Sequence, residues 1–233
     1  MPSHTRLGHP LDAAGTALLT VECQEGAVGA GSALPELAEE ARSSGALGTI
    51  ARLAAAHARG VQALHALAER RPDGRGAGRN ARLFHAAEPL PVRQPTGSAA
   101  VRVAAPIEVT DEDLVVRRLH GLSPIQGTEA DALLRNLGRH TLIVTGVSAT
   151  VAVPHAVFDA VDFGYAMVVP TDATAGVPAD CARALIRHTL ALVATLTTTG
   201  ELLTHLAGPT SPAPRAPAPV GAVRSGTDLL RPA

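Results

Sequence analysis

The segment 113–176, DLVVRRLHGLSPIQGTEADALLRNLGRHTLIVTGVSATVAVPHAVFDAVDFGYAMVVPTDATAG, decides the fold of this protein. It contains three short apolar runs, DLVV (113–116), TLIVT (141–145) and AMVV (166–169), separated by stretches with Ala, Val and Leu at helical spacing. Short runs that are apolar throughout are typical of strands buried on both faces. Alternation of such strands with helices predicts a parallel sheet with right-handed crossovers.

The N-terminal half continues the same pattern. Its apolar runs TALLTVE (16–22) and VQAL (61–64) predict two more strands. The helices that we expect cover residues 47–59, 129–137, 153–163 and 179–197. Gly60, Gly138 and Gly164 stand where helix C-caps need a positive φ, and Thr128 stands where an N-cap belongs. The elements predict an α/β protein, a three-layer αβα sandwich around a mainly parallel, Rossmann-like central sheet.

The chain divides into one domain with two tails. We expect a flexible segment at 1–14, the domain at 15–207 and a disordered tail at 208–233, which is rich in Pro and Ala. Inside the domain, 25–48 and 71–80 are expected to be loops that shape a pocket. The second of these, RPDGRGAGRN, reads either as a mobile active-site loop or as an ordinary solvent loop.

Composition excludes several classes of protein. Aromatic residues are 2% of the chain and the net charge is -1, so neither stacking platforms nor a basic stripe for nucleic acid is expected. The sequence has no apolar run near the roughly 20 residues that cross a bilayer, and no secretion signal at its start, so no membrane is expected. Cys23 and Cys181 form no CxxC pair, which favours a reducing, cytoplasmic setting.

Polar residues follow the predicted strands at the sheet edge where open α/β proteins bind ligands. These candidates are Glu22, Gln24, His65, Arg117, Arg118, His120, Ser148, Thr150 and Asp172.

Two blocks of the sequence resemble isochorismatase-like hydrolases, the cysteine hydrolase superfamily. TALLTVECQEG (16–26) resembles the family's opening strand, with Glu22 in the place of its aspartate and Gln24 matching its glutamine. Segment 113–176 resembles the family's second half, with matches at Gly127-Thr128, Thr145-Gly146 and Asp172-Ala173. The resemblance covers roughly residues 15–205 and implies the family's fold, a small-molecule substrate and a homo-oligomer, a dimer or tetramer.

The resemblance also shows where this chain departs from the family. The family's cysteine nucleophile lies six residues after the glycine that is Gly146 here, and that position is Ala152. Neither Cys23 nor Cys181 occupies it, and Arg118 stands in the place of the catalytic lysine. Isochorismatases proper also lack the cysteine, which implies acid/base chemistry by a carboxylate.

We therefore predict Glu22 as the acid/base residue, with two roles open for Arg118. Arg118 either stabilises the anion of Glu22 or grips a substrate carboxylate. Gln24 and His120 are candidate substrate-binding residues. Around Ala152, Ser148 and Thr150 are candidate nucleophiles, hydrogen-bond donors or helix caps, and Val151-Ala152 is the candidate cis peptide that the family often has.

No cofactor and no metal are expected, because the DxHxxH run of the nicotinamidase branch is missing. The predicted helix 179–197 is either an oligomer interface or part of the protein's own core. Three functions remain open: a hydrolase, a catalytically retired relative that binds a metabolite or a protein partner, and a lyase or isomerase that uses the same pocket.

Overall fold

The computed structural model describes residues 11–89 and 94–206. The predicted tail 208–233 and most of the predicted N-terminal segment 1–14 lie outside the described residues.

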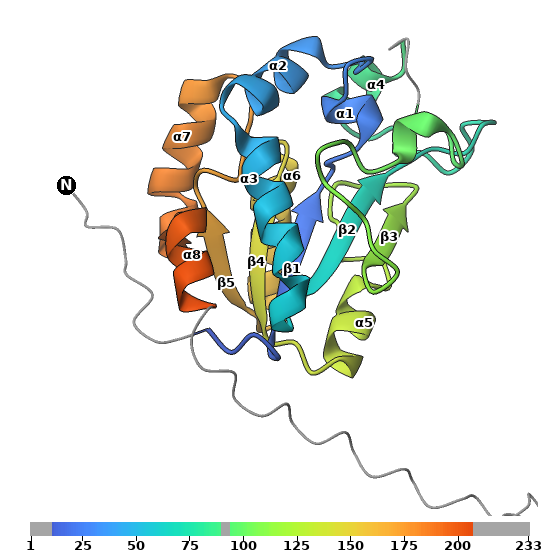
Figure 1. The fold of residues 1–233 in the computed structure, drawn as a ribbon. Helices are drawn as coiled ribbons and strands as arrows, with labels where there is room; N and C mark the ends of the chain where they lie inside the picture. Colours follow the sequence, from blue (N-terminus) through green and yellow to red (C-terminus); the bar gives the residue numbers. More distant parts are fainter. Residues whose placement is uncertain (1–10, 90–93, 207–233) are drawn as a thin grey trace, which may run out of the picture.

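A six-stranded parallel sheet forms the centre of the molecule, in the order β3-β2-β1-β4-β5-β6. Its strands are β1 (Thr16–Val21), β2 (Gln62–Ala68), β3 (Leu114–Arg118), β4 (Thr141–Gly146), β5 (Ala166–Pro170) and β6 (Thr195–Thr197). The first five confirm the predicted strands. In Figure 1 their arrows point toward α1, α2 and α4, so these helices lie at the carboxyl end of the sheet.

Helices cover both faces of the sheet, which confirms the three-layer αβα architecture. They are α1 (Glu25–Val28), α2 (Pro35–Ser43), α3 (Ala46–Ala54), α4 (Arg82–Ala87), α5 (Ala130–Asn136), α6 (Ala152–Asp162), α7 (Ala179–His188) and α8 (Thr199–His205). Helix α3 crosses the front of the sheet and α6 lies behind it (Figure 1).

Strand β1 separates two hydrophobic cores. Ala17, Leu19 and Val21 pack with α5, α6 and α7, whereas Leu18 packs with α2, α3 and α8. All six residues of β1 are buried, as expected for a strand covered on both faces. No helix within the described ranges 11–89 and 94–206 is long and apolar enough to cross a membrane.

Helix ends follow the predicted signals in most places. Gly60, Gly138 and Gly164 have φ values of 91°, 67° and 87°, which confirms the predicted left-handed positions. The Thr128 hydroxyl accepts a hydrogen bond from the amide of Ala130 at the start of α5.

Three predictions about local structure were wrong. The expected helix 179–197 ends at His188, and the chain then forms a short 3-10 turn and β6, because Thr195–Thr197 adds an edge strand to β5. The expected loop 25–48 contains α1 and α2. His65 lies within β2 and is fully buried, because that strand continues to Ala68.

Candidate functional site

Glu22 and Arg118 form an ion pair at the carboxyl edge of the sheet. Glu22 directly follows β1, its φ is 52°, and its amide donates to the carbonyl of Ala66 on β2. Arg118 is the last residue of β3, and its Nη2 donates to Oε1 of Glu22 across the end of β2. The side chains are 22% and 7% exposed, so the guanidinium is the more deeply buried partner. The structure thus brings together the two residues predicted as acid/base group and cation.

This pair lines a pocket of about 200 Å³. His120, a candidate substrate-binding residue, also lines it, two residues beyond β3. Ala77 and Gly78 bring the glycine-rich loop 71–80 into its wall. The larger apolar side chains of the lining are Leu34, Leu83, Phe84, Leu119 and Leu122. A mostly apolar pocket with a few polar groups is the usual form of a small-molecule site.

Three further polar residues in this wall were missed by the sequence reasoning: Glu69, Arg70 and Gln94. Glu69 has a side chain only 5% exposed, and it pairs with Arg117 at 3.7 Å. Glu69 and Arg70 follow the true end of β2 at Ala68, so the correct strand length would have marked both. No local signal marks Gln94, since long-range packing brings it to the pocket.

Gln24 is not in the lining of this pocket. Its side chain is fully buried, and its amide donates to the carbonyl of Ala68 at 2.6 Å and accepts from the amide of Ala68 at 2.8 Å. It also donates to Gln94 Oε1 at 3.1 Å. These bonds hold the end of β2 beside the segment after β1, so Gln24 stabilises the backbone next to the pocket.

The segment 148–152 lies beyond β4, the strand next to β1, and outside the lining of the Glu22 pocket. The Ser148 and Thr150 hydroxyls bond each other at 2.6 Å and do not cap α6. Instead, the main-chain carbonyl of Ser148 accepts from the amide of Val153 at 3.1 Å. Ala152 is the first residue of α6 and is buried. The prediction of a cis peptide at Val151-Ala152 was wrong: a non-proline cis peptide bond lies four residues earlier, at Val147-Ser148.

Gly146 allows β4 to approach β1 at this edge. Its φ is 110°, and a Cβ atom there would lie 2.2 Å from the carbonyl oxygen of Val21. The close approach lets the amide of Val147 donate to that same oxygen. This is the junction between β1 and β4, from which the strand order runs outward in both directions, and open α/β sheets bind ligands near such a switch point.

The cysteines do not supply a nucleophile to the pocket. Cys23 is completely buried, and burial together with the nearby negative charge of Glu22 raises the pKa of its thiol to about 12. A thiol in this state is almost entirely protonated at neutral pH, whereas catalysis requires the thiolate. Cys181 is exposed on α7 and is not in the lining of the Glu22 pocket.

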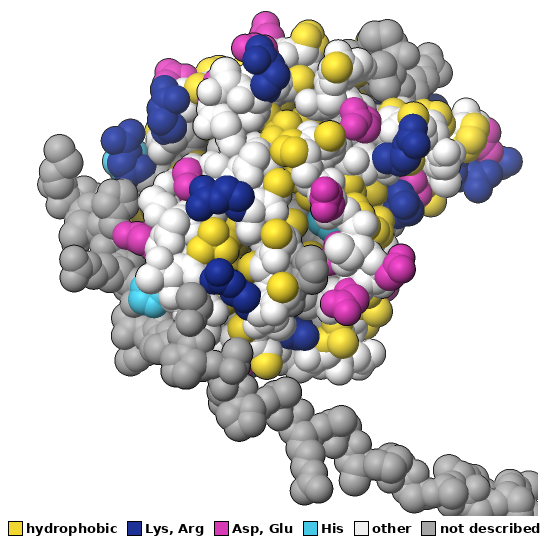
Figure 2. Space-filling view, viewed as in Figure 1, with side chains coloured by type: hydrophobic (Ala, Val, Ile, Leu, Met, Phe, Trp, Pro, Cys, Tyr) yellow, Lys and Arg dark blue, Asp and Glu magenta, His cyan; other side chains and the backbone are white. Residues whose placement is uncertain are grey.

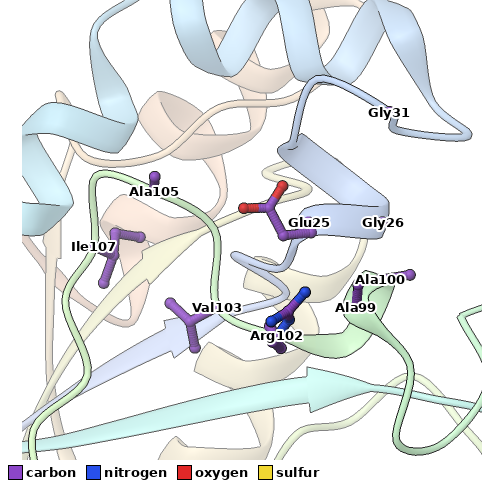
Figure 3. A pocket seen from close by; sticks show the side chains of 9 residues that line it. All are labelled: Glu25, Gly26, Gly31, Ala99, Ala100, Arg102, Val103, Ala105 and Ile107. Carbon is purple, nitrogen blue, oxygen red and sulfur yellow. The ribbon is translucent and has the colours of Figure 1, made fainter.

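A larger depression, of about 550 Å³, lies between α1 and the segment 99–107 (Figure 3). Its lining carries two charged residues, Glu25 and Arg102, among small and apolar ones. None of the predicted site residues lines it. The smaller pocket is therefore the candidate functional site, because charged residues at the ends of three neighbouring strands meet there.

The side chains of the described part of the chain do not form a metal centre. Within residues 11–89 and 94–206, no group of three or more His, Cys, Asp or Glu side chains lies close enough to hold an ion. A zinc site of the Asp/His type therefore does not fit these residues.

Comparison with known proteins agrees with this architecture. No curated protein matches the sequence. An isochorismatase family protein from Desulfovibrio vulgaris has 27% identity and a TM-score of 0.71, covering 83% of this chain and 98% of that one. A cysteine hydrolase from Pseudomonas syringae has 22% identity and a TM-score of 0.68, covering 84% and 94%. Pyrazinamidase of Pyrococcus horikoshii, solved in complex with zinc, has 15% identity and a TM-score of 0.64, covering 79% and 99%.

The family model for the isochorismatase domain matches residues 16–201, from the first residue of β1 into α8. That range contains the whole central sheet and both members of the Glu22–Arg118 pair. The chain therefore belongs to the isochorismatase family.

Proposed function

We propose that the protein is a hydrolase of isochorismatase type that acts on a small molecule by acid/base chemistry of Glu22, without a cysteine nucleophile. The observation that carries the proposal is the Glu22–Arg118 ion pair in the wall of a pocket at the carboxyl edge of the sheet. Ala152 supports it, because the methyl group at the family's cysteine position has no nucleophilic atom.

Of the two acid/base roles, we assign Glu22 that of the base. Its Oε1 accepts the hydrogen bond from Arg118, and its Oε2, which has no hydrogen-bond partner among the described residues, is left to accept a proton from water. Glu22 would take a proton from a water molecule while the water oxygen attacks the substrate, and would then return that proton to the leaving group. Arg118 would hold the carboxylate in place rather than bind the substrate.

The start of α6 lies beside β4, outside the lining of the Glu22 pocket, and would serve a substrate that extends beyond that pocket. The amide of Ala152 begins a helix and donates to no acceptor among the described residues, as expected for the first turn. Such amides stabilise negative charge on a ligand or on a reacting oxygen. Ser148, Thr150 and Val151 precede this amide and would position it.

The test is turnover of a panel of small esters, amides and enol ethers by the wild-type protein and three variants. We expect Glu22→Gln to lose at least about a hundredfold of the wild-type rate. The neighbouring Glu25→Gln, which alters a carboxylate in the other depression, should retain the rate. A variant with both cysteines replaced by Ala should also retain it. Circular dichroism checks that each protein is folded at the assay temperature.

An unchanged rate in Glu22→Gln, or loss of activity in the cysteine-free variant, would contradict the proposal. Isotope-labelled water separates hydrolysis from a lyase or isomerase reaction, because only hydrolysis places the label in the product. A folded wild-type protein that turns over no member of the panel, yet binds some of them, supports the alternative of a retired binding relative. The observation behind that alternative is that the Glu22 carboxylate is already engaged in an ion pair with Arg118.

We also propose that the protein is a cytoplasmic homo-oligomer that binds no nucleic acid. Large apolar side chains are exposed on neighbouring helices and just after them: Leu137 after α5 is 43% exposed, Phe158 within α6 is 40% exposed and Phe163 after α6 is 38% exposed. Arg135 donates to the carbonyl of Phe163, so these two helix ends lie side by side. Light scattering after size-exclusion chromatography measures the oligomeric state.

A further inference from the structure

We infer that the Glu22 pocket takes an anionic small molecule and that Arg70 binds its carboxylate or phosphate group. The inference rests on the proposed function only in taking this pocket as the substrate site. The sequence suggested that Arg118 grips a substrate carboxylate. The inference assigns this role to Arg70, which follows the neighbouring strand β2.

Arg70 stands between two adjacent hollows. It lies two residues beyond β2, is half-buried, and lines both the Glu22 pocket and a depression of about 350 Å³ beside it. Ala77, Gly78 and Phe84 are shared by the two linings as well. A molecule that extends from Glu22 into the second hollow would therefore pass Arg70.

The acidic side chains around Arg70 are already paired with other arginines. Each acidic residue that lines either hollow already faces an arginine: Glu22 with Arg118, Glu69 with Arg117 at 3.7 Å, Asp73 with Arg71 at 2.8 Å and Glu88 with Arg79 at 4.0 Å. Figure 2 shows basic and acidic side chains next to one another on the projecting part of the surface at the right. Within residues 11–89 and 94–206, the Arg70 guanidinium has neither an ion-pair nor a hydrogen-bond partner.

A half-buried cation without a partner is unfavourable, because it loses hydration and gains no opposite charge. Arg118 differs, because its charge is balanced by Glu22 and its Nε contacts the carbonyl of Gly121 at 3.4 Å. An incoming anion would compete with Glu22 for Arg118 but with no carboxylate for Arg70. A guanidinium also matches a carboxylate or phosphate with two parallel hydrogen bonds.

The backbone of Arg70 is fixed although its side chain is free. Its amide donates to the carbonyl of Gln94 at 3.0 Å, and its carbonyl accepts from the amide of Thr96 at 2.8 Å and from the Thr96 hydroxyl at 3.2 Å. A side chain on a fixed backbone loses less entropy when it binds a ligand. Leu34, Leu83, Phe84 and Leu119 provide apolar contacts for the rest of the molecule.

The experiment compares benzoate with benzamide, which have the same ring but differ in charge, and adds inorganic phosphate as a second anion. Binding to the full chain is followed by chemical-shift changes of the backbone amides. We expect benzoate to bind about tenfold tighter than benzamide, and this preference to disappear in Arg70→Gln. Arg71→Gln is the matched control, because Arg71 is the next residue and is engaged by Asp73.

Three results would overturn the inference: equal binding of benzoate and benzamide to the wild-type protein, a preference that persists in Arg70→Gln, or no response to either anion near the Glu22 pocket. Arg70→Gln removes no side-chain hydrogen bond or ion pair within the described residues, so it should fold, and its unfolding midpoint verifies this. Glu22→Gln should keep the preference for benzoate. Loss of turnover in that variant therefore tests the proposed function separately from the anion site.

Discussion

Replacing Glu22 by Gln should destabilise the protein more than replacing Arg118 by Met. Arg118 is 7% exposed, and its Nη1 is buried without a hydrogen-bond partner in the described part of the chain. The Gln side chain keeps an acceptor for Nη2 but removes the counter-charge from a buried cation. In Arg118→Met the remaining carboxylate is already 22% exposed and can regain water.

The magnitude follows from this burial. Removing one partner of a fully buried pair costs about 3–5 kcal/mol. Because one partner of this pair reaches solvent, we expect about 2–3 kcal/mol for Glu22→Gln and about 1–2 kcal/mol for Arg118→Met. The double variant should lose about 2 kcal/mol, less than the sum, since no uncompensated charge remains.

Urea unfolding at neutral pH, followed by circular dichroism, measures all four proteins of this cycle. The loss in Glu22→Gln corresponds to a decrease in melting temperature of about 5–10 °C for a protein of this size. Additivity of the two single changes within about 0.5 kcal/mol would refute the reasoning, because it would show that the charges do not interact. A larger loss in Arg118→Met would refute the assignment of the arginine as the more buried charge.

Three other residues give independent predictions. Gly146→Ala should destabilise the protein by about 3 kcal/mol or more, because its Cβ would lie 2.2 Å from the β1 backbone at a positive φ. In Gly164→Ala the added Cβ meets no atom within 4 Å, so backbone strain alone should cost about 1–2 kcal/mol. Urea unfolding measures both. Burial lowers the pKa of His65 below its usual 6.5, so the unfolded chain binds a proton that the folded protein does not. Stability should therefore fall as the pH decreases below about 6.5, by up to about 1.4 kcal/mol per pH unit from this group, and unfolding midpoints of His65→Gln across that range should show a flatter profile. A thiol reagent at mildly alkaline pH should modify Cys181 in the native protein and both cysteines in the denatured one; rapid native modification of Cys23, whose pKa is about 12, would contradict its burial.

The pocket is assembled from segments that are distant in sequence. Arg118 and Glu22 are 96 residues apart, and Gln24 and Gln94 are 70 apart. The parallel order β3-β2-β1 places the ends of these strands at one edge. A small change in strand length or register would therefore separate the charges that we propose to be functional.

Sequence patterns alone determined the class of fold and its first five strands. The reason is local: β1, β4 and β5 are apolar on both faces, and the glycines after helices are needed for a left-handed backbone. The position of Glu22 at a strand end also follows from its neighbours, so it was predictable as a candidate. The family resemblance added that the cysteine nucleophile is missing at Ala152, because it compares this position with a known motif.

Only the tertiary structure decided which charges meet. No local sequence pattern shows that Arg118 pairs with Glu22 or that the Gln24 side chain bonds to the backbone of Ala68. Nor does any pattern show that Arg70 has no partner among the described residues. Each of these depends on strands that the sheet order brings together. The same holds for β6 and His65. An edge strand of three residues exists because β5 offers it hydrogen bonds, and His65 is buried because its strand extends beyond the apolar run that marks it.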